Sequence, residues 1–271
     1  MTEQLTEPGS GLFTGVTLVR PSGFAQWRAL TGRIVRTMAT KGELIVAVIT
    51  PLVFTLGFYL PLRWVMQVQG IDYEQFVMPI IVLQTMSFTM MSNAQIAAFE
   101  TASGLNTRMQ TMPVGRLVPL LSRLSAGLVR SVTSLIAALV FGYAIGFRLH
   151  SSVWQSALFC VFSLGVGTVL AIGADALGCL TKSPESLSQA LTLPTLILGM
   201  LSCGFVPETG FPAWIRPFVR NQPISQFSFA LRDMAAASGV SWHVLWVPLV
   251  WLGGLAVCFV PLAVWASMRR E

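Results

Sequence analysis

The chain has 271 residues, of which 54% are hydrophobic and only 10% are charged, and its mean hydropathy is +0.70. A soluble domain carries about 25% charged residues, so this chain could not cover a water-exposed surface with polar groups. Its net charge of +6 comes mostly from arginines in the gaps between apolar blocks, the pattern of topology signals rather than of a nucleic-acid-binding patch. The composition predicts an all-α polytopic membrane protein that does not bind nucleic acid.

The first 19 residues are expected to form a flexible cytoplasmic N-terminus. This stretch contains Glu3 and Glu7 but no Lys or Arg. A secretory signal needs a basic segment followed directly by an apolar one, so no cleavage is expected here. The first membrane-spanning block then acts as the insertion signal.

Residues 20–43 have the pattern of an amphipathic helix that lies in the cytoplasmic membrane interface. Arg33 and Arg36 fall opposite a row of apolar residues, where they can meet anionic lipid. A solvated leader without membrane contact is the alternative. The apolar row, at helical spacing, consists of Phe24, Trp27, Leu30, Ile34 and Met38.

Residues 44–271 are expected to form one membrane domain, with six apolar blocks that suit helices of about 20 residues. With the N-terminus inside, 11 Lys and Arg residues lie in the inner loops and 5 in the outer loops. This excess predicts a plasma-membrane protein with both termini in the cytoplasm. The expected spans are Leu44–Leu62, Phe76–Gln95, Leu117–Phe147, Val153–Leu177, Leu187–Val206 and Val244–Met268.

The second expected span is the most polar of the six. Gln84, Ser87, Met91 and Gln95 share one face of this helix. Amides in lipid need partners, so this face is expected to meet other helices or to line a substrate path. The residues alone favour neither packing nor a path over the other.

The cytoplasmic segment Ser92–Gly115 is expected to contain a short helix with exposed Leu and Met side chains. Such a helix favours contact with a partner protein. The alternative is a span end that protrudes from the membrane. The residues that suggest a helix here are Phe99, Glu100, Gly104, Leu105, Met109, Met112 and Pro113.

Charges within spans are costly, and two of them predict an ion pair. Arg123 lies 26 residues before the turn near Leu149, and Asp175 lies 26 residues after it. The two side chains should therefore lie at similar depth and form a structural pair, with Arg130 as a possible competitor for Asp175. Replacing Asp175 with Asn should disturb assembly.

The external segment Pro207–Gly239 is rich in Pro yet apolar. It is too broken for one span, so it predicts two short helices, near Pro212–Val219 and Ile224–Ala237, that dip into the outer leaflet. Non-helical backbone at that depth must be shielded by protein or line a cavity. The segment is therefore a candidate external gate, with Phe211, Trp214, Phe218 and Phe227 as its aromatic residues.

No pattern for catalysis or metal binding is found. A phosphate-binding loop needs Gly-Lys, but neither Lys41 nor Lys182, the two lysines, follows a glycine. The four cysteines and two histidines have no metal-ligand spacing. The chain is expected to be non-enzymatic, to bind no cofactor directly and not to hydrolyse ATP.

Three stretches resemble the permease subunit of ABC-2 type exporters. F-E-T-A-S-G-L-N-T-R-M-Q-T-M-P-V (99–114) is similar to that family's coupling helix, and S-P-E-S (183–186), with a span ending in G-F-V-P (204–207), is similar to its fifth span. F-P-A-W-I-R-P-F-V-R-N-Q-P-I-S-Q-F-S-F-A-L-R (211–232) closely resembles actinobacterial permeases of the daunorubicin-resistance type, including exporters of complex mycobacterial lipids.

This resemblance implies a permease that exports a hydrophobic lipid or drug, with ATP and Mg²⁺ on a separate ATP-binding subunit. A second permease subunit, identical or paralogous, would complete the pathway. A self-contained secondary transporter is the alternative, but it usually needs charged residues at mid-membrane. The residues that the resemblance places against the ATP-binding subunit are Trp27, Arg36, Glu100, Gly104, Leu105, Arg108 and Met109.

Overall fold

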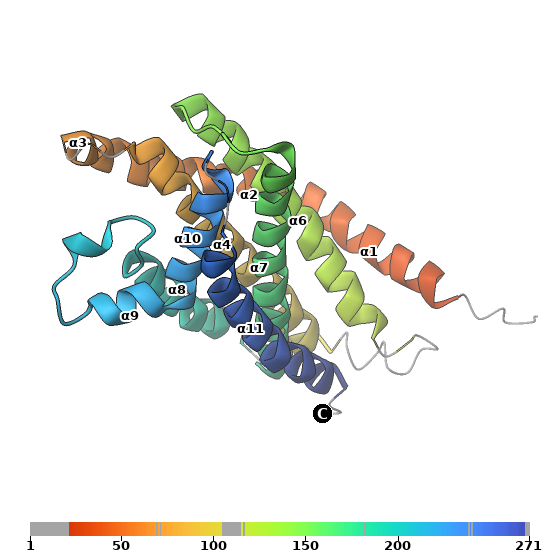
Figure 1. The fold of residues 1–271 in the computed structure, drawn as a ribbon. Helices are drawn as coiled ribbons and strands as arrows, with labels where there is room; N and C mark the ends of the chain where they lie inside the picture. The colour runs from red at the N-terminus through yellow and green to blue at the C-terminus, as the bar shows by residue number, and fades with distance from the viewer. Residues whose placement is uncertain are drawn as a thin grey trace, which may run out of the picture.

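The structure is a computed structural model, and it describes residues 22–68, 70, 72–104, 115, 117–181, 183–237, 239 and 241–268. Within these residues the secondary structure is helical and contains no strand, which confirms the all-α prediction (Figure 1). The elements in chain order are α1 (Gly23–Thr40), α2 (Glu43–Phe54), the π-helix η1 (Thr55–Tyr59), α3 (Leu60–Val68), α4 (Tyr73–Ala102), α6 (Val118–Ile145), α7 (Val153–Leu180), α8 (Pro184–Met200), the 3₁₀ turn η2 (Glu208–Gly210), α9 (Arg216–Asn221), α10 (Pro223–Ala235) and α11 (Trp242–Met268).

Five helices in the described part of the chain are long and apolar enough to cross a membrane. The first is the unbroken run of α2, η1 and α3, and the others are α4, α6, α7 and α11. They match five of the six predicted spans. The second span is longer than the predicted Phe76–Gln95, because α4 continues without a break to Ala102.

The fifth predicted span, Leu187–Val206, is only partly helical. Its helix, α8, ends at Met200, and residues 201–206 form buried turns instead. The physical reason lies in Gln222, whose Nε2 donates hydrogen bonds to the carbonyls of Leu198 (3.2 Å) and Leu201 (2.6 Å). These contacts satisfy carbonyl groups that a continuing helix would otherwise use. The sixth crossing stays a prediction, because α8 is too short to qualify by itself.

Arg232 on α10 holds the turn after α8 in place. Its Nη2 donates to the carbonyls of Cys203 (2.9 Å) and Gly204 (2.6 Å), and its Nε donates to the carbonyl of Phe76 (2.9 Å). The guanidinium also lies 3.6 Å from the centroid of the Phe76 ring. One side chain therefore joins α10, α4 and the turn that ends α8.

Replacing Arg232 with Met should lower the stability of the folded protein by about 1–2 kcal/mol, because buried carbonyls would lose a charged donor. Arg232→Lys should recover only part of this loss, since an ammonium cannot span carbonyls on separate elements as a guanidinium does. The measurement is the melting temperature in detergent. Arg220→Met on the exposed surface of α9 is the control, and equal melting of both Met variants would contradict this role.

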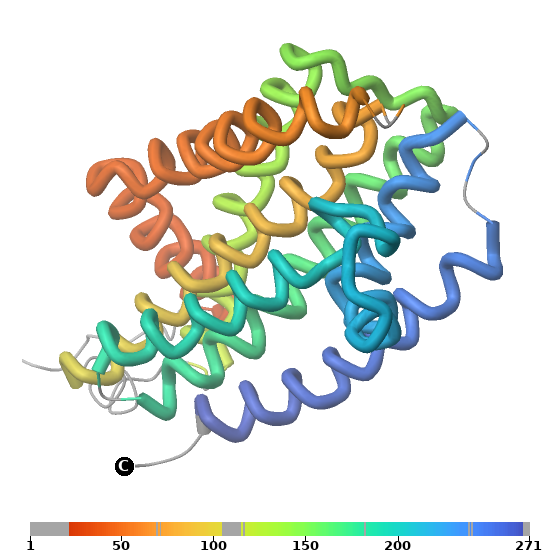
Figure 2. Tube along the Cα trace, turned by 90° about the vertical axis from the view of Figure 1, so that its left-hand side faces the viewer, coloured from red at the N-terminus to blue at the C-terminus, as the bar shows by residue number. Residues whose placement is uncertain are grey.

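The central helix of the bundle is α4. Figure 2 shows it running through the middle of the molecule, with α2 on one side and α8 on the other. Glycines on α6 and α7 permit its close packing: a methyl group on Gly142 would lie 2.6 Å from Met78 Cε, and one on Gly178 would lie 2.5 Å from the carbonyl oxygen of Ala94. Small residues at helix contacts are typical of membrane bundles, where backbone proximity replaces the hydrophobic effect.

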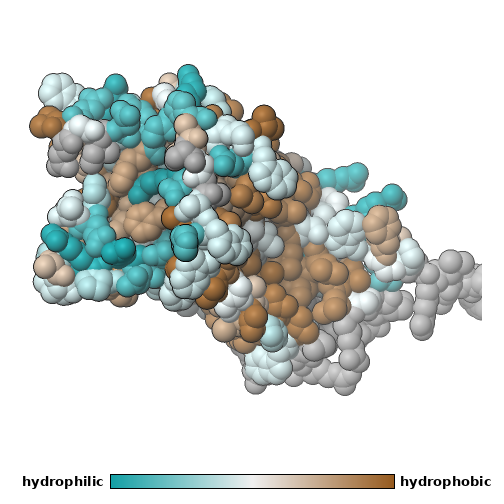
Figure 3. All heavy atoms as spheres, viewed as in Figure 1, coloured by the Kyte–Doolittle hydropathy of each residue, from teal (hydrophilic) through white to brown (hydrophobic). Residues whose placement is uncertain are grey.

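The outer surface of the bundle is apolar over α11 and its neighbours. Figure 3 shows a broad hydrophobic surface there, while hydrophilic side chains gather over α9. Most of α11 is exposed on this surface, and its exposed residues include Trp246, Val250 and Val257. In water such a surface would drive aggregation, whereas in a bilayer it faces lipid.

The helix predicted within residues 20–43 is present as α1. Its N-cap is Ser22, whose Oγ accepts a hydrogen bond from the Ala25 amide (3.3 Å), and Gly42, with a φ of 76°, separates it from α2. It packs along the first half of α6 (Figure 1), where Trp27 Nε1 donates to Ser125 Oγ (3.0 Å). Its location at a membrane surface stays a prediction.

Candidate functional site

The predicted pair of Arg123 and Asp175 is present, and it belongs to a larger buried network. Arg123 Nε lies 2.6 Å from Asp175 Oδ1, and Arg123 Nη2 lies 2.9 Å from Asp175 Oδ2. Arg123 Nη1 also lies 3.0 Å from Glu100 Oε2. All three residues are buried, so α4, α6 and α7 are joined by charges that water cannot screen. This place in the bundle, where α4 and α7 end and α6 begins, is called the basal end below.

Glu100 was expected on a separate short helix, and for the described residues this expectation is wrong. The helix α4 continues without a break to Ala102, and Gly104, with a φ of 66°, stands just beyond its end. A left-handed glycine is a common helix terminator. Glu100 itself is 7% exposed and bound to Arg123, so its carboxylate does not face a partner protein in this structure.

The other residues expected to contact an ATP-binding subunit are only partly described. Leu105, Arg108 and Met109 lie outside the described residues. Trp27 is partly buried against α6, whereas Arg36 is exposed on α1. The structure therefore places Glu100 and Trp27 within the bundle's own contacts and leaves Arg36 accessible.

Arg130 does not compete for Asp175, because it pairs with Glu43 at the start of α2. Its Nη1 also donates to Asn93 Oδ1 (3.4 Å). The sequence argument missed Glu43 because it counted that residue with the interfacial helix rather than with the first span. The sequence did contain a signal for this pair, because Glu43 is an acid directly before an apolar block in a chain with few charges.

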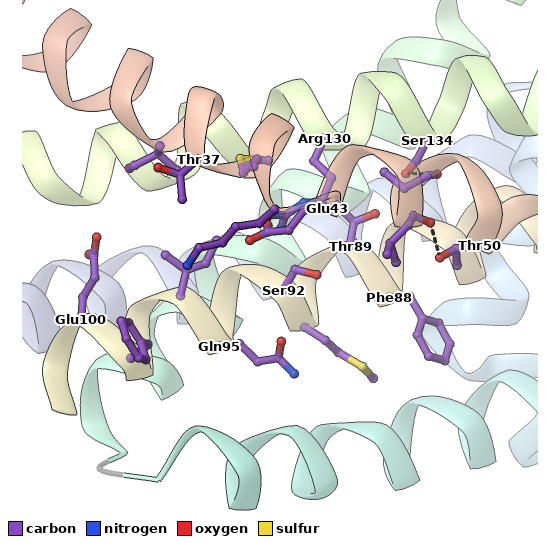
Figure 4. A pocket seen from close by; sticks show the side chains of 18 of the residues that line it. Thr37, Glu43, Thr50, Phe88, Thr89, Ser92, Gln95, Glu100, Arg130 and Ser134 are labelled. Carbon is purple, nitrogen blue, oxygen red and sulfur yellow. Dashed lines mark hydrogen bonds and ion pairs between the residues drawn. The ribbon is translucent and has the colours of Figure 1, made fainter. Parts of the chain in front are cut away.

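A cavity of about 610 Å³ lies beside the Arg130–Glu43 pair, between α1, α2, α4 and α6. Figure 4 shows Glu100 and Thr37 at one end of it, Phe88 and Thr50 at the other, and the Glu43 and Arg130 side chains between them. The cavity is open on one side rather than enclosed, so a molecule from outside the bundle can reach it. Its lining combines apolar side chains with a few polar and charged groups, which makes it a candidate ligand site.

The four residues of the predicted substrate path are divided by the structure. Met91 and Gln95 line the cavity. Gln95 Nε2 also donates to Ser188 Oγ (2.6 Å) on α8. Gln84 is buried at the contact with α8, where a methyl group on Gly199 would lie 2.6 Å from its Oε1, and the Ser87 hydroxyl donates to the Leu83 carbonyl (3.0 Å). Gln84 and Ser87 are therefore packing residues. For Met91 and Gln95, which line the cavity, a role in the substrate path stays a prediction.

Two short helices are present in the segment Pro207–Gly239, α9 and α10, which are divided at Gln222, while their location at the outer leaflet stays a prediction. Their aromatic residues do not form one group. Trp214 and Phe218 are 80% and 53% exposed, whereas Phe227 is buried in the main core with its ring centroid 5.8 Å from that of Phe162. Phe211, partly buried, precedes α9. A gate built from all four rings is therefore wrong in this structure, since Phe227 packs inside the bundle.

The comparisons with known proteins agree with this architecture. The family described as ABC-2 family transporter protein matches residues 60–265. The doxorubicin resistance ABC transporter permease protein DrrB of Mycobacterium tuberculosis is 39% identical over 249 residues, which cover 87% of this chain and 86% of DrrB. The probable doxorubicin resistance permease protein DrrC of the same organism is 30% identical over 166 residues, covering 61% of this chain and 59% of DrrC.

The match to the family extends over most of the chain, from α3 to the last turns of α11. The similarity to DrrB covers nearly the full length of both proteins. Together with five long apolar helices, these matches show that the chain is a multi-pass membrane protein and belongs to the ABC-2 family of transporter proteins, as a permease of the DrrB and DrrC type.

Proposed function

We propose that the chain is the membrane-spanning subunit of an ATP-driven exporter that moves a hydrophobic lipid or drug-like molecule out of the cell. The observation that carries this proposal is the basal network of Arg123, Asp175 and Glu100. It ties the last turn of α4, where the segment 99–114 that resembles a coupling helix begins, to α6 and α7. A push on that segment by an ATP-binding subunit would reach three helices together.

The proposal includes six crossings, with both termini in the cytoplasm. The 17 residues of α8 span about 26 Å, slightly less than the apolar core of a bilayer. The buried turn at 201–206 and the helices α9 and α10 would complete this crossing from the outer side, held there by Arg232. The turn at 201–206 is buried against the rest of the bundle, which is the condition for irregular structure at membrane depth.

The residues for contact with the ATP-binding subunit remain those of the resemblance, with one change of role. Arg36, with Gly104, Leu105, Arg108 and Met109, would make the contact, while Glu100 and Trp27 would transmit movement into α6. ATP and Mg²⁺ would be held by the partner subunit. A second permease, a copy of this chain or a paralogue such as the DrrB and DrrC pair suggests, would complete the pathway.

A self-contained secondary transporter is less well supported. Such transporters use ionisable groups near mid-membrane to bind the coupling ion. Of the described residues, the buried acids are Glu100 and Asp175, and both are bound to Arg123 at the basal end. Neither carboxylate is therefore placed to bind a coupling ion at mid-membrane.

Reconstitution in vesicles tests the proposal. The chain should move a hydrophobic fluorescent compound only when an ABC ATP-binding subunit and ATP are both present. Glu100→Gln should keep the complex assembled but reduce ATP-dependent transport several-fold, because the neutral amide holds Arg123 more weakly than the carboxylate does. Glu185→Gln, an exposed acid on α8, is the matched control. Transport driven by an ion gradient without any ATP-binding subunit would support the secondary transporter instead.

A further inference from the structure

The cavity between α1, α2, α4 and α6 is elongated along α4. Its lining on α4 runs from Phe88 to Glu100, so it follows that helix for about 18 Å at 1.5 Å per residue. The end near Thr50 and Phe88 reaches into the bundle, and the other end lies beside α1 (Figure 4). A ligand in this cavity would therefore have one end deep and one end near the basal surface.

The deep part of the cavity presents an apolar wall although several of its residues are polar. The hydroxyls of Thr50, Thr89 and Ser134 donate to the carbonyls of Val46 (2.7 Å), Thr85 (2.9 Å) and Ala47 (2.9 Å). A hydroxyl that bonds to a nearby backbone carbonyl offers its carbon atoms to a ligand. With Phe88 and Met91 beside them, these residues suit an apolar body.

The end of the cavity beside α1, called its outer part here because it lies nearest the basal surface, has an excess of positive charge. The two acids that line it are already bound, Glu43 to Arg130 and Glu100 to Arg123. Arg33 and Lys41 also line it, are exposed, and form no ion pair with any described residue. The unopposed charge at the cavity is therefore cationic.

Arg130 adds a buried donor at the boundary between the two parts. It is only 2% exposed, it lines the cavity, and its Nε has no hydrogen-bond partner in the described part of the structure. A buried donor without an acceptor costs free energy, which a ligand oxygen at this position would recover. Arginine is also well suited to bind phosphate or carboxylate.

We propose that this cavity binds an anionic amphiphile, with its phosphate or carboxylate at Arg33, Lys41 and Arg130 and its apolar body along Met91 and Phe88. As a statement about the transported class this rests on the exporter proposed above. The binding itself does not, and it can be measured without an ATP-binding subunit.

The test uses the full chain in nanodiscs made only of zwitterionic lipid. The probe is a lysophosphatidic acid with a photoreactive diazirine in its acyl chain, compared with the lysophosphatidylcholine of the same chain and with glycerol 3-phosphate alone. The acid should bind most tightly and should label α4 between Phe88 and Gln95. Glycerol 3-phosphate should compete weakly, because it lacks the apolar body.

Two variants locate the contacts. Arg33→Gln/Lys41→Gln should weaken binding of the anionic probe about five- to tenfold, the range for two exposed charge contacts, and should leave the zwitterionic probe unchanged. Arg28→Gln/Arg220→Gln removes the same charge from exposed residues that do not line the cavity, and should change neither probe. Ser92→Phe, which fills the cavity from α4, should abolish labelling while the melting temperature is retained.

Equal affinity for both probes, labelling outside the cavity helices, or unchanged binding in both the double and the Ser92→Phe variants would overturn the inference. If the double variant does not fold, the comparison of probes on the unchanged chain and Ser92→Phe decide it. ATP-dependent movement of a neutral compound, without binding of the anionic probe, would overturn this inference and leave the exporter proposal standing. Binding of the acid without ATP-dependent movement of any compound would support the site and count against export.

Discussion

Replacing Arg123 with Met should destabilise the folded protein by about 3–5 kcal/mol, the cost of leaving buried charge without its partner. Two carboxylates depend on this guanidinium. Asp175 is fully buried and Glu100 nearly so, and both form ion pairs with Arg123. The expected result is a large fall in melting temperature in detergent, together with poor recovery of monodisperse protein. Asp175→Asn should disturb assembly less than Arg123→Met does, since Arg123 keeps its ion pair with Glu100.

The control for this prediction is Arg28→Met, which removes an exposed arginine from α1 and should change the melting temperature little. A second comparison separates charge from shape. The triple variant Arg123→Met/Asp175→Leu/Glu100→Gln should be more stable than Arg123→Met alone, because an apolar replacement of a whole buried network is close to neutral. If Arg123→Met melts like the unchanged protein, the network does not hold the basal end together.

Alanine at Gly178 should destabilise the fold by about 2–3 kcal/mol, although alanine is the better helix former. The added methyl group would lie 2.5 Å from the Ala94 carbonyl oxygen and 2.7 Å from Ala97 Cβ. Neither neighbour is the end of a flexible side chain, so α4 and α7 would have to move apart. Valine at the same position should be worse, and the order Gly, Ala, Val should appear in the melting temperatures.

Gly165 provides a matched control on the same helix. The nearest atom to a methyl group there is Leu252 Cδ2 at 3.9 Å, an ordinary contact distance. Gly165→Ala should therefore stabilise α7 by about 0.5–1 kcal/mol through helix propensity alone. The two substitutions have the same chemistry and opposite expected signs. A fall in melting temperature for both would point to a general intolerance of α7 rather than to close packing with α4.

Several features of this protein follow from the sequence by itself. Long apolar blocks in a chain with few charges predict membrane helices wherever they occur, because the bilayer requires each span to satisfy its own backbone. The start of α10 at Pro223 is equally local, since proline fits the first turn of a helix and favours an extended conformation for the residue before it, here Gln222. The Arg123–Asp175 pair was also predictable, because two antiparallel spans around one turn place equally distant residues at the same depth.

Other features depend on partners that are remote in the chain, and only the tertiary structure decided them. The end of α8 is set by Gln222 and Arg232, more than 20 residues away, whose donors take up the carbonyls of the preceding helix and turn. The burial of Phe227 depends on Phe162, and the partner of Arg130 is Glu43. Periodicity identifies the face of a helix, but it does not identify the neighbour that this face meets. For that reason the six-block pattern could be read from the sequence, whereas the cavity, with its cationic outer part and apolar depth, could not.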